Sequence, residues 1–193
     1  LRGDADLNIS DAVSEINAQL TTLHELNEKI VQYTVMGYDG VADLEDQRDE
    51  ALRTISEKID ISYFKRDNGS MVIQTKNGET LLDDEPHYLS HTAISQAGPT
   101  TSYAGGEISG IFVNGKDITN SIQDGEIKGL IEIRDVTLPS LQSQLDELAG
   151  GLKEAINSAH NMGTSYPAPS SLTGTRTFIN ANQQSIQIEN GDV

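Results

Sequence analysis

The first part of the chain alternates apolar and polar positions in the manner of a long helix. Its apolar residues recur at steps of four and three, which places them on one face of a coiled-coil type of helix. They are Ile9, Val13, Ile16, Leu20, Leu23 and Ile30, with Leu26 beside the stripe. Asn8 or Ser10 is expected to cap the start of this helix, and Gly37 with the turn at 39–40 is expected to end it.

A second helix is predicted directly after this turn. Its apolar residues, which share one face, are Val41, Leu44, Leu52, Ile55 and Ile59. The connection is short, so the two helices are expected to form an antiparallel hairpin over residues 1–60. Asn17 and Asn27 of the first helix lie on or beside its stripe, where a polar side chain usually fixes the register between helices.

After residue 60 the pattern changes to short β-branched or aromatic runs, which are typical of strands. The runs lie at 61–64, 71–75 and 108–113. Turn signals separate them at Asp67-Asn68-Gly69, Lys76-Asn77-Gly78 and Asn114-Gly115. Residues 61–136 are therefore predicted to form a small β-rich domain with a polar, glycine-containing loop near 96–106.

The helical pattern returns at residue 137, where Pro139 suits a first helical turn. The stripe of this third helix, predicted at 137–163, comprises Leu138, Leu141, Leu145, Leu148, Leu152 and Ile156. The predicted fold class is α+β: long antiparallel amphipathic helices form a bundle, with the β-rich domain inserted between the second and third helices. Residues 164–193 are predicted to form a Pro/Ser linker and a β-rich tail, with strands at 175–178 and 185–188.

Charge narrows the choice of partners. The 193 residues contain 13 Lys and Arg against 30 Asp and Glu, a formal net charge of -17. Such a field repels phosphate backbones and anionic lipid headgroups, so neither nucleic acid nor a membrane is expected as a partner. The chain has no cysteine and no apolar run of membrane-spanning length. Its start at Leu1 and its end at Val193 are interpreted as the edges of an excised interior segment.

Motifs that carry chemistry are sparse, and we expect no enzyme, no cofactor and no metal site. The chain has no nucleophile elbow, Walker loop, dinucleotide-binding motif or zinc-protease motif. His87 and His91 are four apart, but Pro86 favours a loop over a shared helix face. Polar residues at 4, 6, 8 and 15 match a calcium-loop spacing, yet Ile9 stands where that loop needs glycine. Helix capping explains the same residues more simply and is the favoured interpretation, and whether they bind calcium stays open.

Two stretches carry a family resemblance. The first comprises Ile16, Asn17, Leu20, Leu23, Leu26, Asn27, Ile30, Asp43 to Asp49, Leu52, Ile55 and Ile59 to Ile61. The second comprises Gly125, Gly129, Leu130, Arg134, Asp135, Leu138, Pro139, Gln144 to Asp146, Leu148, Ala149, Ile156, Asn157, His160 and Gly163. Together they cover about two thirds of the chain and resemble the family of flagellar hook-associated protein 1. The chain departs from the family at 164–169, where an acidic glycine-rich stretch is usual, and in its short β-rich insert.

The resemblance implies a structural subunit of the bacterial flagellum that connects hook to filament and permits flagellin assembly. It implies export by flagellar type III secretion without a cleavable signal peptide, an extracellular location and no cofactor. The implied partners are copies of itself in a ring, the hook protein, neighbouring hook-associated proteins and an export chaperone. It also implies an interior fragment that lacks the terminal polymerising segments and is expected to be monomeric.

The residues themselves supply candidate helix-packing and interface positions. These are Leu20, Leu23, Asn27, Ile30, Arg48, Asp49, Leu52, Arg134, Asp135, Leu145, Leu148 and Leu152. Stiff helices with polar residues on the stripe would stack in one register, and the Arg-Asp pairs would bridge helices within a subunit or between subunits. The alternative function is a surface adhesin, with the helices as a stalk and the β-rich domain as the ligand-binding module.

Overall fold

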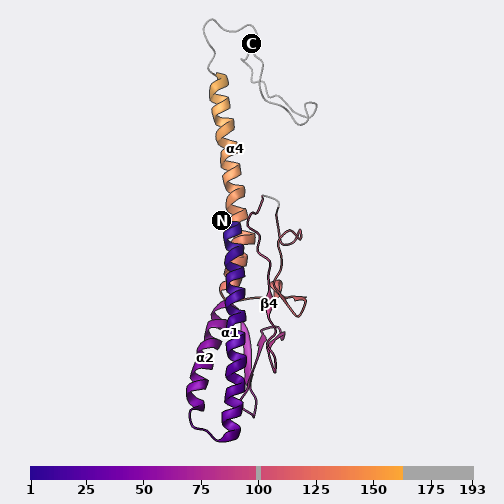
Figure 1. Cartoon of the computed structure of the whole chain (residues 1–193). Coiled ribbons are helices and arrows are strands. Elements are labelled where there is room, and N and C mark those ends of the chain that lie inside the picture. The colour runs from indigo at the N-terminus through magenta and orange to yellow at the C-terminus, as the bar shows by residue number, and fades with distance from the viewer. Residues whose placement is uncertain (99–100, 163–193) are drawn as a thin grey trace. The chain divides into compact units, whose positions relative to one another are not determined.

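The computed structural model has an α+β fold and describes residues 1–98 and 101–162 (Figure 1). The predicted linker and tail at 164–193 lie outside the described residues. The chain divides into two compact units, residues 1–146 and 147–193. All elements except the later part of the last helix belong to the first unit.

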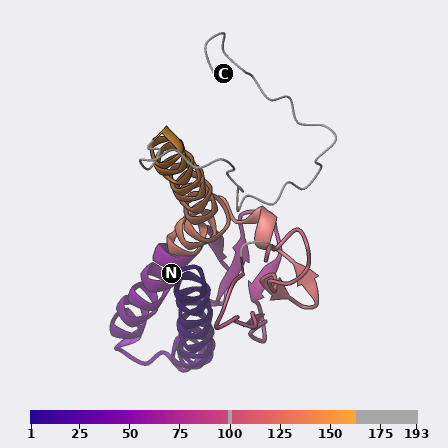
Figure 2. The ribbon, with the colours of Figure 1, turned by 90° about the horizontal axis from the view of Figure 1, so that it is seen from above.

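The first unit begins with the helical hairpin, in which α1 (Arg2–Met36) is followed by α2 (Val41–Lys58). Gly37 ends α1 in the left-handed conformation, with φ 65°, and its N–H bonds back to the carbonyl of Thr34. A residue with a side chain adopts this conformation only with strain, which explains why glycine stops the helix here. Figure 2 shows both helices of the hairpin on one side of the unit and the strands on the other.

Helix α1 starts earlier than the sequence pattern predicts. Asn8 and Ser10 lie within the helix rather than at its cap. The buried face continues past them to Ala5, and alanine is the strongest helix former. Because the smaller alanine side chains did not count as part of the apolar stripe, the pattern placed the start of the helix too late.

The first sheet packs beside the hairpin and has the strand order β1 (Ile61–Lys65), β2 (Met71–Thr75), β3 (Thr80–Leu82). All neighbours are antiparallel. The turns use Gly69 and Gly78 with φ of 89° and 86°. These are the positions at which the Asn-Gly signals predicted turns, because glycine tolerates positive φ.

The second sheet is smaller and is also antiparallel, with β4 (Leu89–Ser90) next to β5 (Phe112–Val113) and β5 next to β6 (Lys116–Asp117). Asn114 and Gly115 form the turn between the last two strands, with φ of 51° and 77°. Positive φ at both central residues is the requirement of the tight hairpin turn that an Asn-Gly pair predicts.

Helical structure returns at Glu126 and not at residue 137. Helix α3 (Glu126–Glu132) leads through a π-helical turn, η2 (Ile133–Thr137), into α4 (Leu138–Met162). Gly129 and the β-branched Ile127 weaken the helix signal of α3 in the sequence. Tertiary packing overrides that weakness, because Ile127 is fully buried in the core.

A single hydrophobic core joins the hairpin, both sheets and α3. Its buried members include Ile16, Leu20, Leu23, Leu52, Ile55, Ile73, Leu82, Val113, Ile118 and Ile127. The segments predicted as a helical hairpin and as an inserted β-rich domain therefore pack as one unit in the structure. No helix among the described residues has the length and apolar character needed to cross a bilayer.

Candidate functional site

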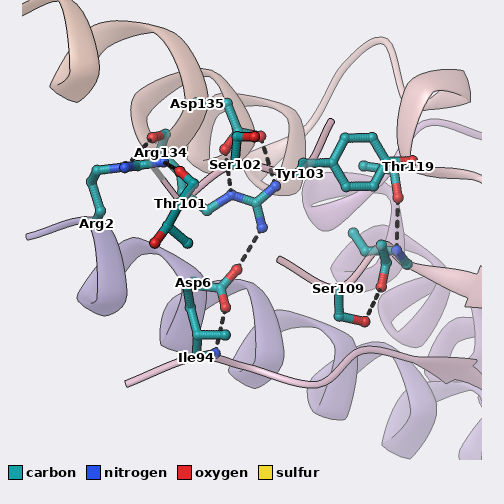
Figure 3. A network of polar contacts seen from close by, with 12 residues as sticks. Arg2, Asp6, Ile94, Thr101, Ser102, Tyr103, Ser109, Thr119, Arg134 and Asp135 are labelled. Carbon is teal, nitrogen blue, oxygen red and sulfur yellow. Dashed lines mark hydrogen bonds and ion pairs between the residues drawn. The ribbon is translucent and has the colours of Figure 1, made fainter. Parts of the chain in front are cut away.

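A buried ionic cluster is the most concentrated polar feature of the first unit (Figure 3). At its centre the guanidinium of Arg134, with 1% side-chain exposure, pairs with the fully buried carboxylate of Asp6. Asp135 accepts the other two bonds, from Nε at 2.9 Å and from Nη2 at 2.7 Å. Burial alone would lower the pKa of Arg134, but its hydrogen bonds to Asp135 and Asp6 outweigh burial and raise it. Arg134 is therefore a permanent buried cation held by two carboxylates.

Asp6 also ties the segment after β4 to α1. Its second oxygen accepts the backbone N–H of Ile94 at 2.7 Å. The Nε2 atom of His91 lies 3.3 Å from the other oxygen, and Nδ1 of the same ring lies 3.2 Å from the carbonyl of Gly110. Gly3 permits the close approach, because a Cβ at that position would lie 2.6 Å from the backbone oxygen of Ser95.

Arg2 closes the cluster from the start of α1 (Figure 3). It donates to the carbonyls of Arg134 at 3.0 Å, Gly98 at 3.1 Å and Thr101 at 2.6 Å. The first of these carbonyls needs a donor from outside its own helix. In a π-helical turn its partner would be the N–H of Pro139, which proline lacks.

We call Arg2, Asp6, His91, Arg134 and Asp135 the Arg134 cluster. Together its members join three parts of the chain that are far apart in sequence: the N-terminal turns of α1, the residues after β4 at 91, 94, 98 and 101, and the π-helical turn. Removal of Arg134 or Asp6 would leave its buried partner without the opposite charge, so this pair strongly favours the observed meeting of the segments. These contacts position the three segments relative to one another.

Asn17 and Asn27 have a role that the sequence pattern did not predict. The side chain of Asn27 accepts the backbone N–H of Met71 at 2.9 Å and donates to the Met71 carbonyl at 2.8 Å. Asn17 makes the same pair of bonds with the backbone of Leu89, both at 2.8 Å. An asparagine amide that exchanges two hydrogen bonds with one residue imitates a neighbouring strand. Both residues therefore fix strands β2 and β4 against α1, rather than the register between helices.

Other ion pairs also join elements within the chain. Arg48, buried on α2, donates to the carbonyl of Gly69 at 2.9 Å and lies 3.6 Å from Glu45 and 3.9 Å from Asp49. Lys58, at the end of α2, lies 3.0 Å from Glu15 of α1 and 2.6 Å from Glu126 of α3. These carboxylates raise the pKa of Lys58 through hydrogen bonds, that of Glu126 first.

The candidate interface residues fall into two groups in the structure. The buried group comprises Leu20, Leu23, Asn27, Ile30, Arg48, Leu52 and Arg134, to which the partly exposed Asp135 is bonded. The exposed group comprises Asp49 on α2 and Leu145, Leu148 and Leu152 on α4. The three leucines are 64%, 68% and 59% exposed. Among the candidate interface residues, these three leucines are the apolar ones whose side chains are exposed.

The described residues offer little to a catalyst or to a metal ion. They contain no group of three or more His, Cys, Asp or Glu side chains arranged to hold a metal. Positions 4, 6, 8 and 15 of the calcium spacing lie along the straight helix α1, which cannot wrap around an ion, and Asp6 is already paired with Arg134. His87 and His91 lie on either side of β4.

Tyr103 and Asp117 are a hydrogen-bonded pair of titratable side chains that could be considered for acid-base catalysis. The Tyr103 hydroxyl donates to the Asp117 carboxylate at 2.7 Å. Burial, followed by the bond to Asp117, raises the pKa of Tyr103. Burial opposes ionisation of Asp117 as well, but bonds from Thr119 and Tyr103 outweigh it and lower the pKa of Asp117. Both shifts favour the ordinary protonation states at neutral pH, so the pair is a structural contact rather than an acid-base site.

Comparisons with known proteins agree with the fold. A family model described as the helical domain of the flagellar hook-associated protein FlgK matches residues 1–177. The flagellar hook-associated protein 1 of Salmonella typhimurium is 25% identical over 161 residues, and that of Escherichia coli K12 is 25% identical over 162. Each alignment covers 82% of this chain, which spans 29% of the length of these relatives.

A solved structure has the same fold. The chain is similar to the flagellar hook junction protein FlgK from Burkholderia pseudomallei, with a TM-score of 0.52 and 20% sequence identity. The alignment covers 69% of this chain and 24% of that one. Because the family model extends over most of the sequence, the chain belongs to the family of the FlgK helical domain.

Proposed function

We propose that this chain is the helical part of a flagellar hook-associated protein 1, which connects hook to filament and permits flagellin assembly. The observation that carries the proposal is the family match over residues 1–177, together with two curated relatives that bear this name. The buried ion pairs of the Arg134 cluster support it, since they suit a rigid structural element. A surface adhesin was the alternative, and none of these matches supports it.

The same proposal covers location and partners. The protein acts outside the cell as part of the flagellum after type III export. Its partners are copies of itself in a ring, the hook protein, neighbouring hook-associated proteins and an export chaperone. It works as a structural protein without enzymatic activity or a cofactor. The net charge of -17 supports solubility of the free subunits before assembly.

Deletion of the gene that encodes the protein tests this function. We expect cells with complete hooks but no filaments and with flagellin monomer in the medium, because nothing then permits flagellin to assemble on the hook. Electron microscopy and a flagellin assay of the culture supernatant measure both outcomes. Motile cells with normal filaments would contradict the proposal and favour an adhesin.

We further propose that the exposed leucines of α4 are an interface of the bundle in the full-length protein. Leu145, Leu148 and Leu152 continue a three-and-four spacing, which is the pattern of a helix that packs against another helix. The three side chains are at least 59% exposed. Several apolar side chains exposed on one helix typically mark a surface that a partner covers. The partner in this proposal is a helix of the full-length protein beyond this chain.

The isolated chain provides a stability prediction for these leucines. Leu148→Ser with Leu152→Ser should change its free energy of unfolding by no more than about 0.5 kcal/mol per site, because exposed positions contribute little to the folded state. Leu20→Ser, at a fully buried position of α1, is the matched control and should destabilise strongly. Denaturant titration followed by circular dichroism measures both variants against the unchanged chain. A large loss from the α4 double variant would mean that these leucines pack within the chain itself.

A further inference from the structure

The end of the helical hairpin extends beyond the core. The last buried residue of α1 is Ile30 and the first buried residue of α2 is Arg48. None of the residues between them, 31–47, is buried. We call this segment the hairpin tip. Ordering a helix end costs conformational entropy that a core normally offsets, so a tip without buried residues has no evident stabilising role in the fold.

The hairpin tip nevertheless carries large apolar side chains. Val35, Met36 and Tyr38 are 81%, 56% and 60% exposed and lie within four consecutive positions. The ring of Tyr38 packs edge-on against that of Tyr33, with centroids 5.5 Å apart, which holds it in place. Large apolar side chains exposed so close together in the chain are typical of an interaction site, whereas apolar residues that are scattered singly are ordinary surface.

The charge at the hairpin tip has one sign. It contains Asp39, Asp43, Glu45 and Asp46 and no Lys, Arg or His. Glu45 is neutralised by Lys65 of β1, but the other three carboxylates are exposed and have no cation among the described residues. The end of α1 adds partial negative charge from its free carbonyls, and its last turn has no basic residue to balance it.

We propose that the hairpin tip is a docking surface for a protein segment that presents apolar side chains beside lysine or arginine. The apolar residues supply contact area and the surrounding carboxylates select a cationic partner. A second copy of this chain does not fit, because two tips would bring six carboxylates without a cation close together. Anionic lipid is excluded by the same repulsion. The surface is distinct from the leucines of α4, so the inference stands apart from the proposed bundle interface.

The test uses peptide probes and the whole 193-residue chain. The probes are a helical peptide of leucine and lysine and a counterpart with glutamate in place of lysine. The Leu145→Ser, Leu148→Ser, Leu152→Ser background removes the apolar face of α4 as a competing site. We expect saturable binding of the lysine peptide only, with NMR shift changes centred on residues 35–39. Circular dichroism confirms that each variant below keeps its fold.

Substitutions at the tip should remove this binding. We expect Val35→Ser, Met36→Ser, Tyr38→Ser together, and separately Asp39→Lys with Asp43→Lys, to weaken it by about tenfold or more, because both act at the contact itself. Leu1→Ser with Leu7→Ser is the matched apolar control and Asp11→Lys with Glu25→Lys the matched charge control, since all four residues are exposed and precede the tip in or beside α1. Both controls should keep nearly full affinity.

Three results would overturn the proposal. Equal loss of binding in the tip variants and in their controls would show that the peptide does not bind at the tip. Binding of the glutamate peptide, or no binding of either peptide, would contradict a cationic partner. Tip-dependent dimers in sedimentation analysis would assign the surface to a second copy of the chain.

Discussion

Arg134→Met is expected to lower the free energy of unfolding by about 3–5 kcal/mol, which is the typical cost of removing one partner from a buried ion pair. The substitution keeps much of the side-chain volume but leaves the carboxylate of Asp6, which is 0% exposed, without its cation. Chemical denaturation followed by circular dichroism measures the loss. The effect should exceed that of any exposed ion pair in the chain.

Arg53→Met is the matched control for this prediction. Arg53 on α2 also holds two carboxylates, Glu50 and Glu57, both at 2.6 Å, but its side chain is 60% exposed. Solvent screens such pairs, so little or no loss is expected. A double-mutant cycle of Arg134→Met and Asp6→Asn should show strong coupling. Arg134→Met leaves the Asp6 carboxylate without a cation, and Asp6→Asn removes that unpaired charge. Equal losses for Arg134→Met and Arg53→Met would contradict the structural role of the Arg134 cluster.

Asn27→Ala is expected to cost about 2–4 kcal/mol, since it leaves both the N–H and the carbonyl of Met71 buried without a partner. Asn17→Ala should cost less, because its bonds to Leu89 are only partly buried and water can replace the amide. Asn8→Ala, at an exposed position of the same helix, should have no measurable effect. Thermal and denaturant unfolding of the three variants provides the ranking.

Hydrogen exchange of the Asn27→Ala variant distinguishes two roles for Asn27. If the side chain fixes strand β2 to α1, hydrogen exchange of the amides in β2 should rise in Asn27→Ala while α2 keeps its protection. Loss of protection in both helices, with β2 unchanged, would instead support the register role that the sequence pattern suggested.

The helices of the hairpin and the turns were predictable because their signals are local. A three-and-four spacing of apolar residues from Ile9 to Ile30 can bury one face only as a helix, and the Asn-Gly pairs before Gly69, Gly78 and Gly115 require a positive φ that few other residues accept. The α+β class follows from the change of period after residue 60.

The contacts that define the Arg134 cluster could not be predicted in this way. Arg134 and Asp6 are 128 positions apart, and a single sequence contains nothing that joins them. The Arg134-Asp135 pair was singled out from the sequence, but its buried partner was not. A possible signal is the unusual location of Asp6 on the buried face of α1, between Ala5 and Ile9, where a charge requires a partner.

The roles of Asn17 and Asn27 and the early start of the third helical segment were missed for related reasons. A polar residue on an apolar stripe signals a specific hydrogen bond but does not say whether the acceptor is a helix or a strand. Helix α3 is short, contains Gly129 and is held by Ile127 in the core, so its stability comes from packing rather than from its own sequence.

The central proposal is that this chain acts at the junction between hook and filament and that the apolar face of α4 packs against another part of the full-length protein. The most direct test is to complement the deletion strain with the full-length protein carrying Leu145→Ser, Leu148→Ser and Leu152→Ser, and to examine the cells by electron microscopy. The account predicts hooks without filaments and flagellin in the medium, although the isolated variant chain stays folded. Normal filaments on motile cells, with the variant protein present at wild-type levels, would contradict it.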